Sequence, residues 1–204
     1  MAWRFDPSVC ARLRELAAQE GTTIFNVLAA TVALAVGRCS GSTDVVLGTA
    51  VSTRDRSELD DLLGCFVNTL PLRIDVGTDD VGELLRRMQV ATSEGLSHNV
   101  PFDRIVERIG RPRELGRQPL YDVTLAGQSD AAQPTSDAFQ VHRIEAESTA
   151  IDRDLQFQVE QLGNPIHGWT QYRTELYDEK TVQRIVDDFV ATFVAMAERK
   201  LPAA

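Results

Sequence analysis

The sequence has few of the residues that build a catalytic centre or a covalent framework. Its three histidines, His98, His142 and His167, are too far apart in sequence to suggest a base–nucleophile or metal-ligand pair. The three cysteines include no CxxC pair, and their odd number argues against a disulfide framework. No HExxH, GxGxxG or GxxxxGK[ST] motif occurs. We therefore expect no metal site and no complete set of catalytic residues.

Positive charge and long apolar runs are also scarce. Lysine and arginine number 21 against 30 aspartates and glutamates, a formal net charge of −9, which argues against nucleic acid and anionic membranes as partners. The longest apolar stretch, residues 27–36, is too short to span a bilayer. Arg4 and Asp6 interrupt any run that would resemble a signal peptide. These features predict a cytoplasmic protein, and a hydrophobic content of 43% is enough for a core.

Helical and strand patterns alternate along the chain. Apolar residues at helical spacing predict helices over residues 8–19, 22–37, 79–96 and 102–109, and a last one capped by Asp178. Short apolar or alternating runs predict strands over residues 44–51, 66–76, 121–126, 139–145, 155–161 and 168–173. This order predicts an α/β fold with a mixed sheet flanked by helices.

Several local features refine that pattern. Ser8 is the expected cap of the first helix, and Pro71 indicates an edge strand or a bulge. Short connections within residues 121–173 predict antiparallel pairing, and the polar stretch 127–137 predicts a loop. Cys65 is a possible nucleophile, but a thiol beside Phe66 is more often a buried packing group. The residues alone thus predict a binding or interaction module.

Five segments match short motifs that occur together in one family. Residues 48–54 (GTAVSTR) are similar to GTPVxGR, and residues 63–73 (LGCFVNTLPLR) to (V/I)GxFVNTxxxR. Residues 97–103 (SHNVPFD) are similar to HQDVPFE, residues 113–120 (RELGRQPL) to RDxSRxPL, and residues 154–155 to the end of FDL. In this order and spacing, they resemble the condensation domains of nonribosomal peptide synthetases over nearly the whole chain. The departures from the motifs are Ala50, Thr53, Ser97 and Arg153.

The resemblance implies an architecture and a reaction. Residues 1–204 would form one C-terminal lobe of the chloramphenicol acetyltransferase-like α/β class, with a mixed, largely antiparallel sheet and with Trp3–Phe5 in its first strand. In the family, two lobes enclose a tunnel that admits the phosphopantetheine arms of carrier proteins, and an HHxxxDG motif in the N-terminal lobe serves amide formation. This chain has no HH pair. The implied partners are therefore a complementary N-terminal lobe and peptidyl or acyl carrier proteins, with no cofactor bound directly.

The resemblance also assigns roles to single residues. Arg54 would pair across the lobe interface with the aspartate of HHxxxDG and have no partner in its own chain, or else be a solvated loop arginine. Asn68 would face the tunnel or make a hydrogen bond at the end of the sheet, and Arg73 would belong to the same tunnel or interface. The loop at 127–137 would be a latch to the other lobe or a plain surface loop. The residues expected to shape the fold are Gly64, Phe66, Pro101, Phe102, Arg117 and Pro119.

Three functions follow from the sequence. The chain is half of a condensation domain that needs an HHxxxDG-bearing lobe, or a non-catalytic module that recruits carrier proteins or tailoring enzymes. An independent acyltransferase ranks last, because no residue suggests its catalyst. A natural half-domain and a piece of a longer chain both fit the expected lobe.

Overall fold

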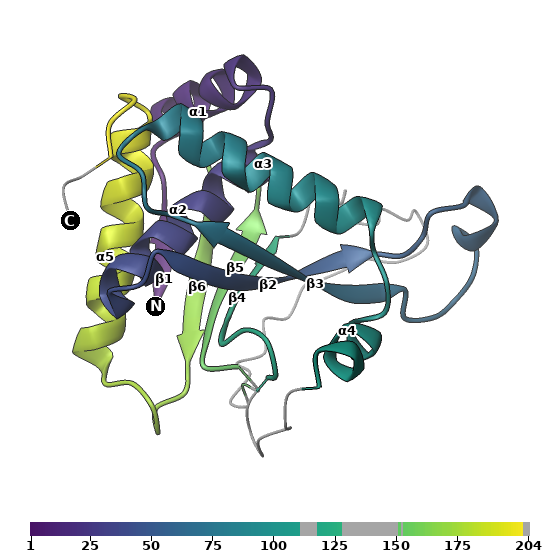
Figure 1. Cartoon of the computed structure of the whole chain (residues 1–204). Coiled ribbons are helices and arrows are strands. Elements are labelled where there is room, and N and C mark those ends of the chain that lie inside the picture. Colours follow the sequence, from purple (N-terminus) through teal and green to yellow (C-terminus); the bar gives the residue numbers. More distant parts are fainter. Residues whose placement is uncertain (111–117, 128–150, 152, 202–204) are drawn as a thin grey trace, which may run out of the picture.

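A six-stranded mixed sheet runs through the computed structural model of the chain, which describes residues 1–110, 118–127, 151 and 153–201. The strands lie in the order β1-β6-β5-β4-β2-β3 (Figure 1). β4 is parallel to both of its neighbours, and the other pairs are antiparallel. The strands are β1 (Ala2–Arg4), β2 (Asp44–Ser52), β3 (Val67–Asp75), β4 (Val123–Gly127), β5 (Leu155–Gln161) and β6 (His167–Tyr172).

The direction of β5 corrects one expectation. Residues 121–173 were expected to pair antiparallel throughout, but β4 and β5 are parallel, and only β5 and β6 are antiparallel. The chain between Gly127 and Leu155 is long enough for a crossover, which parallel strands require and a hairpin does not. The strand predicted over 139–145 and the loop predicted over 127–137, apart from Gly127, lie outside the described residues.

The helices confirm the pattern and correct two of its details. Asp6, not Ser8, caps the first helix: its carboxylate accepts from the Ser8 N–H at 2.7 Å. The second helix continues past Gly37 to Ser40, because its C-cap is Gly41, which has a left-handed conformation with φ of 70°. Gly37 lies inside the helix at a close contact, where an added Cβ would lie 2.8 Å from the Ser42 carbonyl. The helices are α1 (Pro7–Gln19), α2 (Ile24–Ser40), α3 (Val81–Ser97), α4 (Phe102–Ile109) and α5 (Glu179–Met196), with a 3-10 turn η1 (Ser57–Leu59).

The core lies between one face of the sheet and the helices. α2 is buried along most of its length and contacts α1, α3, α5, β2 and β4. At the β1 side, the buried Phe189 of α5 meets the rings of Trp3, Phe5, Phe157 and Phe193 at centroid distances of 5.2–6.4 Å. Within the described chain no single helix is long and apolar enough to cross a membrane, and only α1 and α2 taken together, bent by 102°, meet that criterion.

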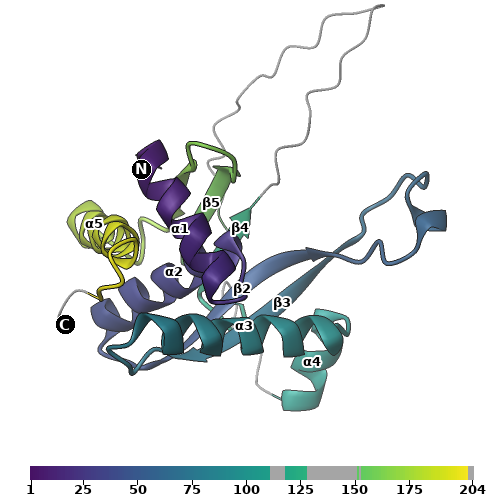
Figure 2. The same ribbon diagram turned by 90° about the horizontal axis from the view of Figure 1, so that it is seen from above.

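The β2–β3 hairpin reaches beyond the rest of the molecule. β3 is an edge strand, as Pro71 predicted, since the missing N–H of proline is tolerated at a sheet edge. Both views show the hairpin extending past α3 and α4 and ending at η1 (Figures 1 and 2). The sheet thus carries its longest strand pair out to a free tip.

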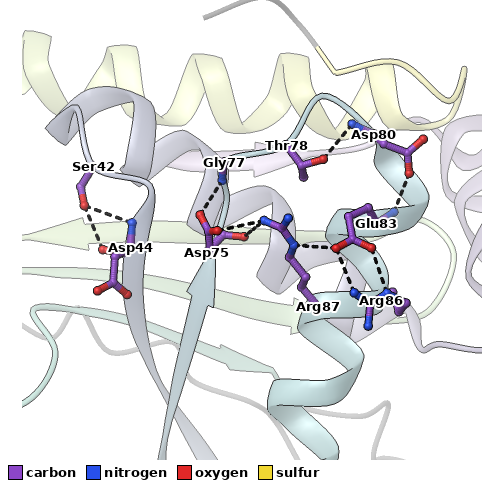
Figure 3. Close-up of polar contacts among 9 residues, drawn as sticks. All are labelled: Ser42, Asp44, Asp75, Gly77, Thr78, Asp80, Glu83, Arg86 and Arg87. Carbon is purple, nitrogen blue, oxygen red and sulfur yellow. Dashed lines mark hydrogen bonds and ion pairs between the residues drawn. The ribbon is translucent and has the colours of Figure 1, made fainter.

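A charged cluster holds the connection from β3 to α3 at the other end of that hairpin (Figure 3). Glu83 accepts bonds of 2.9 Å from both Arg86 and Arg87, and Arg87 also lies 3.2 Å from Asp75. These bonds, chiefly the one from Arg86, lower the pKa of Glu83 from 4.5 to about 2. The cluster joins the end of β3 to the first turns of α3.

Removal of the Glu83 charge should therefore lower the thermal stability of the protein by an amount that depends on pH. Glu83→Gln should lower the melting temperature by about 1–3 °C at pH 7, since such exposed pairs contribute little. Because folding lowers the pKa of this carboxyl, its stabilisation is complete above its ordinary pKa and disappears as the pH falls from 4.5 to about 2. Thermal melts across this range test the effect. Glu58→Gln, which alters an exposed carboxylate without a partner in the described chain, is the control. A constant difference across that pH range would contradict the ion-pair explanation.

Candidate functional site

The two strongest sequence motifs lie side by side on the β2–β3 hairpin. Residues 48–52 form the end of β2 and residues 53–54 follow it, while residues 63–73 lead into β3 and form most of it. Their register pairs Gly48 with Pro71, and Ala50 with Thr69. The motifs at 97–103 and 118–120 approach the same hairpin from α4 and from the segment before β4, as described below. The motif positions therefore form one connected region.

A cavity of about 170 Å³ opens on the sheet face that the core helices leave uncovered. Its walls come from strands β2 to β5 and from the segment before β4. Thr124 is 6% exposed, and its hydroxyl Oγ1 has no hydrogen-bond partner among the residues that the structure describes. A buried hydroxyl without a partner is costly, so it is suited to bind a polar group that enters the cavity. The lining residues are Gly48, Thr49, Ala50, Thr69, Tyr121, Thr124, Leu125, Ala126, Arg153 and Gln156.

Tyr121 forms one wall of this cavity by lying directly on a glycine. Its ring covers Gly48, where an added Cβ would lie 2.5 Å from the ring, and its other neighbour is Phe102 at a centroid distance of 5.5 Å. Tyr121 is 4% exposed, and Pro119, two residues before it, is half-buried. Gly48 thus lets the aromatic ring approach the backbone of β2, and Phe102 packs against the same ring.

Asn68 fastens the start of α4 to β3. Its amide nitrogen Nδ2 donates to Asn99 Oδ1 at 2.7 Å and to the Val100 carbonyl at 2.8 Å. Its oxygen Oδ1 accepts from the Phe102 N–H at 3.0 Å. Pro101 lies inside this loop and precedes the first residue of α4. Of the two roles considered for Asn68, these bonds favour the hydrogen bond at the end of the sheet.

Arg54 organises the tip of the hairpin. Its Nη1 donates to the Leu59 carbonyl and its Nη2 to the Leu62 carbonyl, the latter at 2.9 Å. Its guanidinium carbon lies 4.1 Å from the centroid of the Phe66 ring, a cation–π contact. A Cβ on Gly64 would lie 3.1 Å from that ring. The expectation that Arg54 has no partner in its own chain is therefore wrong, because the tip folds back over its side chain.

The tip also exposes apolar side chains. Leu63 is fully exposed, Leu62 is 50% exposed and Val67 is 62% exposed. Cys65 is exposed as well, which corrects the expectation of a buried thiol. The alternation of the chain around Phe66 turns the phenylalanine toward Arg54 and leaves its neighbours outside. These side chains form a contiguous stretch of sequence, residues 62–67, which we call the apolar tip.

Arg73 does not lie with Arg54 or Asn68. It makes two bonds to Asp44, of 2.8 and 2.7 Å, and both side chains are more than half exposed. The bond from Arg73 lowers the pKa of Asp44, and the same bond raises that of Arg73. Five residues of extended strand separate Arg73 from Asn68, about 16 Å. Arg73 thus forms an exposed ion pair with Asp44 of the neighbouring strand. Arg117 lies outside the described residues.

The described histidines form no catalytic group. His98 Nδ1 lies 3.0 Å from Ser97 Oγ and 2.9 Å from the Glu94 carbonyl, at the end of α3. His167 lies on β6, with Nε2 3.7 Å from Glu160. His142 lies outside the described residues, and among the described ones no cluster of His, Cys, Asp or Glu has an arrangement that could hold a metal ion.

Two residues that contribute to the site lie outside the sequence motifs. Thr124 is a polar residue in an otherwise apolar strand, and its partner Gly48 comes from a parallel strand far away in sequence. Tyr121 follows the RELGRQPL segment directly, so its position next to a motif was a usable signal. Neither residue's contact with β2 can be read from local periodicity, which reports only the face of one element.

Comparison with known proteins identifies the family. A model of the condensation domain matches residues 1–200. A protein described as the probable non-canonical nonribosomal peptide synthetase CymA of Salinispora arenicola is 34% identical over 188 residues, which cover 91% of this chain and 2% of that protein. The chain thus spans a small part of the curated relative's length.

Solved structures agree with this assignment. The X-domain from teicoplanin biosynthesis has a TM-score of 0.89 and 26% identity, with 100% of this chain and 49% of that chain covered. The X-domain in complex with OxyB has a TM-score of 0.84 and 28% identity, with 97% and 45% covered. The open mixed sheet is the expected chloramphenicol acetyltransferase-like fold. From the motif region, the family match and these neighbours together, this chain belongs to the condensation-domain family of nonribosomal peptide biosynthesis.

Proposed function

We propose that this chain is the C-terminal lobe of a condensation domain and forms amide bonds only together with an N-terminal lobe that carries HHxxxDG. The apolar tip is the observation that carries the proposal. It exposes Leu62, Leu63 and Val67 on a hairpin that extends beyond the described body (Figure 2). Apolar side chains gathered on a projecting element are typical of a surface that another unit covers.

The proposal gives the cavity a role in binding the substrate. A carrier-protein phosphopantetheine arm contains amide groups, and the hydroxyl of Thr124 can donate to or accept from such a group. Gly48 and Tyr121 would shape the wall of the tunnel, and Asn68 would keep α4 in place beside it. The histidines of the other lobe would position the attacking amine and move its proton, which requires hydrogen-bond reach.

Arg54 can contribute to the lobe interface while holding the tip. The Leu59 and Leu62 carbonyls use two of its five N–H donors. The other donors remain for a carboxylate such as the aspartate of HHxxxDG, which a planar guanidinium binds well. In this proposal Arg54 positions the apolar tip first and pairs across the interface second.

Substitution of the tip should prevent assembly without unfolding the lobe. Leu63→Asp places a charge on a fully exposed side chain, so the melting temperature should stay within about 1 °C of the wild type. Binding to a purified HHxxxDG-bearing condensation lobe should weaken by at least roughly tenfold, because the charge must be desolvated at the interface. Amide formation from two loaded carrier proteins, followed by mass spectrometry, should fall in parallel.

The control is Leu176→Asp, at an exposed leucine before α5, away from the hairpin. It should leave both binding and amide formation unchanged. Absence of binding between the wild-type chain and any such lobe would rule the proposal out, and so would equal effects of the two substitutions.

A non-catalytic recruitment module is the second candidate, favoured by the likeness to the X-domain in complex with OxyB. In that role the lobe would bind a tailoring enzyme or carrier protein without taking part in amide formation. Binding of such a partner, together with amide formation that is absent or unaffected by Arg54→Ala and Asn68→Ala, would support this candidate over the first.

A further inference from the structure

The sheet face that the core helices leave uncovered carries glutamine side chains from two neighbouring strands. Alternate residues of β5 are buried in the core, so Gln156 and Gln158 between them point to the opposite face, where both are half-buried. The register places Gln156 opposite Gln171 of β6, and Gln158 opposite Trp169. Residues directly opposite each other share one face of a sheet, so these side chains form one surface. We call Gln156, Gln158 and Gln171 the amide row.

The amide row begins at the cavity. Gln156 lines the cavity and lies opposite Thr124 of β4 in the register. From Gln156 the same face of β5 continues past Gln158 to Glu160, a distance of about 13 Å for four residues of strand. At that end Trp169 Nε1 donates to Glu160 Oε1 at 3.1 Å. The row is therefore a polar extension of the cavity, with an indole ring beside it.

The two glutamines of β5 use little of their hydrogen-bonding capacity. Gln156 Nε2 donates to Gln158 Oε1 at 3.3 Å, and Gln158 Nε2 donates to the Val159 carbonyl at 3.4 Å, whereas about 2.9–3.0 Å is usual. Within the described part of the chain, Gln156 Oε1 accepts no hydrogen bond. A side-chain amide has two N–H donors and an oxygen with two lone pairs, so both glutamines can bind further polar groups.

An extended peptide matches the amide row in spacing and in chemistry. Gln156 and Gln158 are two residues apart on a strand, roughly 6.6 Å, and an extended chain repeats its like-facing groups over the same distance. Each peptide group offers one donor and one acceptor, and each glutamine amide can pair with both. An apolar acyl chain would cover these amides without satisfying them, which is costly. The row therefore favours a chain of amide groups over a hydrocarbon chain.

We propose that the amide row selects a peptidyl substrate over a single aminoacyl group, with about three or four of its residues extended along β5. The inference rests on the proposed function, because the phosphopantetheine arm in the cavity delivers the chain to the row. Thr124 would contact the arm, whereas Gln156 and Gln158 would bind peptide groups beyond the thioester. One residue spans only about 3.3 Å, so a single aminoacyl group that reaches Gln156 ends before Gln158.

Three pantetheine derivatives, in which a stable amide replaces the thioester, test the proposal. The first carries acetyl-tetraalanine and the second acetyl-alanine. The third carries a chain of four lactic acid residues, in which ester oxygens replace the peptide N–H groups. Each is titrated against the full chain, with binding followed by NMR of the glutamine side-chain amides. The tetraalanine compound should bind about three- to tenfold more tightly than either of the others, the factor expected for one net hydrogen bond.

Variants of the chain locate the site. Gln158→Leu removes the amide and keeps a side chain of similar size. It should weaken the tetraalanine compound by about three- to tenfold and leave the acetyl-alanine compound unchanged. The matched control is Gln183→Leu on α5, where an exposed glutamine bonds only Asp187 in the described chain. It should change the binding of neither compound, and unchanged melting temperatures would show that both variants fold.

Three results would overturn the proposal: undetectable binding of the tetraalanine compound, equal binding of the three compounds, or binding that is insensitive to Gln158→Leu. Pantetheine also contains amide groups and is the competing occupant. If Gln158→Leu weakened the acetyl-alanine compound as much as the tetraalanine compound, the row would bind pantetheine, which would contradict selection of a peptide. Because these titrations contain no N-terminal lobe, their failure leaves the test of lobe assembly with Leu63→Asp unaffected.

Discussion

Gly168→Ala should destabilise the lobe by about 3 kcal/mol, at the upper end of what one added methyl group costs in a packed interior. Gly168 lies on β6 between Val159 of β5 and Trp3 of β1. An added Cβ would lie 2.0 Å from the backbone carbonyl of Gln158 and 2.6 Å from the Trp3 ring. The carbonyl belongs to the neighbouring strand and cannot rotate away, so β5 and β6 must separate or Trp3 must leave the aromatic cluster.

Thermal and urea unfolding measure this effect. A loss of 3 kcal/mol corresponds to a fall of about 6–12 °C in melting temperature for a domain of this size. Gly127→Ala in β4 is the matched control, since the nearest atom to its added Cβ is 3.5 Å away, an ordinary contact. It should change stability by less than about 0.5 kcal/mol. Similar melting of the two variants would contradict the close approach of Trp3 to β6.

Asn68→Asp should detach α4 from the sheet, with a cost of about 2–3 kcal/mol. The carboxylate can still accept from the Phe102 N–H, but it cannot donate to Asn99 Oδ1 or to the Val100 carbonyl. Both of those acceptors would then face a negative charge at hydrogen-bonding distance. The segment 99–102 should move away, and α4 with it, because β3 is the strand that α4 contacts.

Hydrogen exchange separates this effect from general unfolding. Amides of α4 should exchange faster in Asn68→Asp, while those of α2 keep their protection. Asn99→Ala removes one of the three bonds and should show a smaller change in the same amides. Equal protection of α4 in Asn68→Asp and wild type would show that Asn68 does not hold this helix. In that case a role at the substrate tunnel would regain support.

Local patterns predicted the elements well where one face of each is buried. The helix over 102–109 and the strand over 155–161 match α4 and β5 in both bounds, because each has clear periodicity and a distinct boundary. The wrong predictions concerned which of two nearby residues caps the first helix, and whether β4 and β5 pair in parallel. Asp6 and Ser8 are both capping types, and only the backbone geometry at Asp6 decides between them.

The site was predictable as a set of motif positions but not as a set of contacts. Resemblance to the family identified Asn68, Phe66 and Phe102 as candidate residues. In the structure the Phe102 N–H donates a hydrogen bond to Asn68 Oδ1. Arg54 was expected to reach outward, yet backbone carbonyls five and eight residues further along the chain hold its guanidinium. Such partners depend on how the hairpin tip closes, which no side-chain pattern encodes.

The ends of the sheet affect how the lobe behaves when it is alone. β1 is three residues long, and β3 at the opposite edge carries Pro71 and the charged Arg73 and Asp75. Short, charged or proline-bearing edges are poor templates for adding another strand. Even at high concentration the lobe should therefore not grow into fibrils by edge-to-edge pairing. Any self-association would be limited to contacts between side chains, which salt or a single charged substitution can reverse.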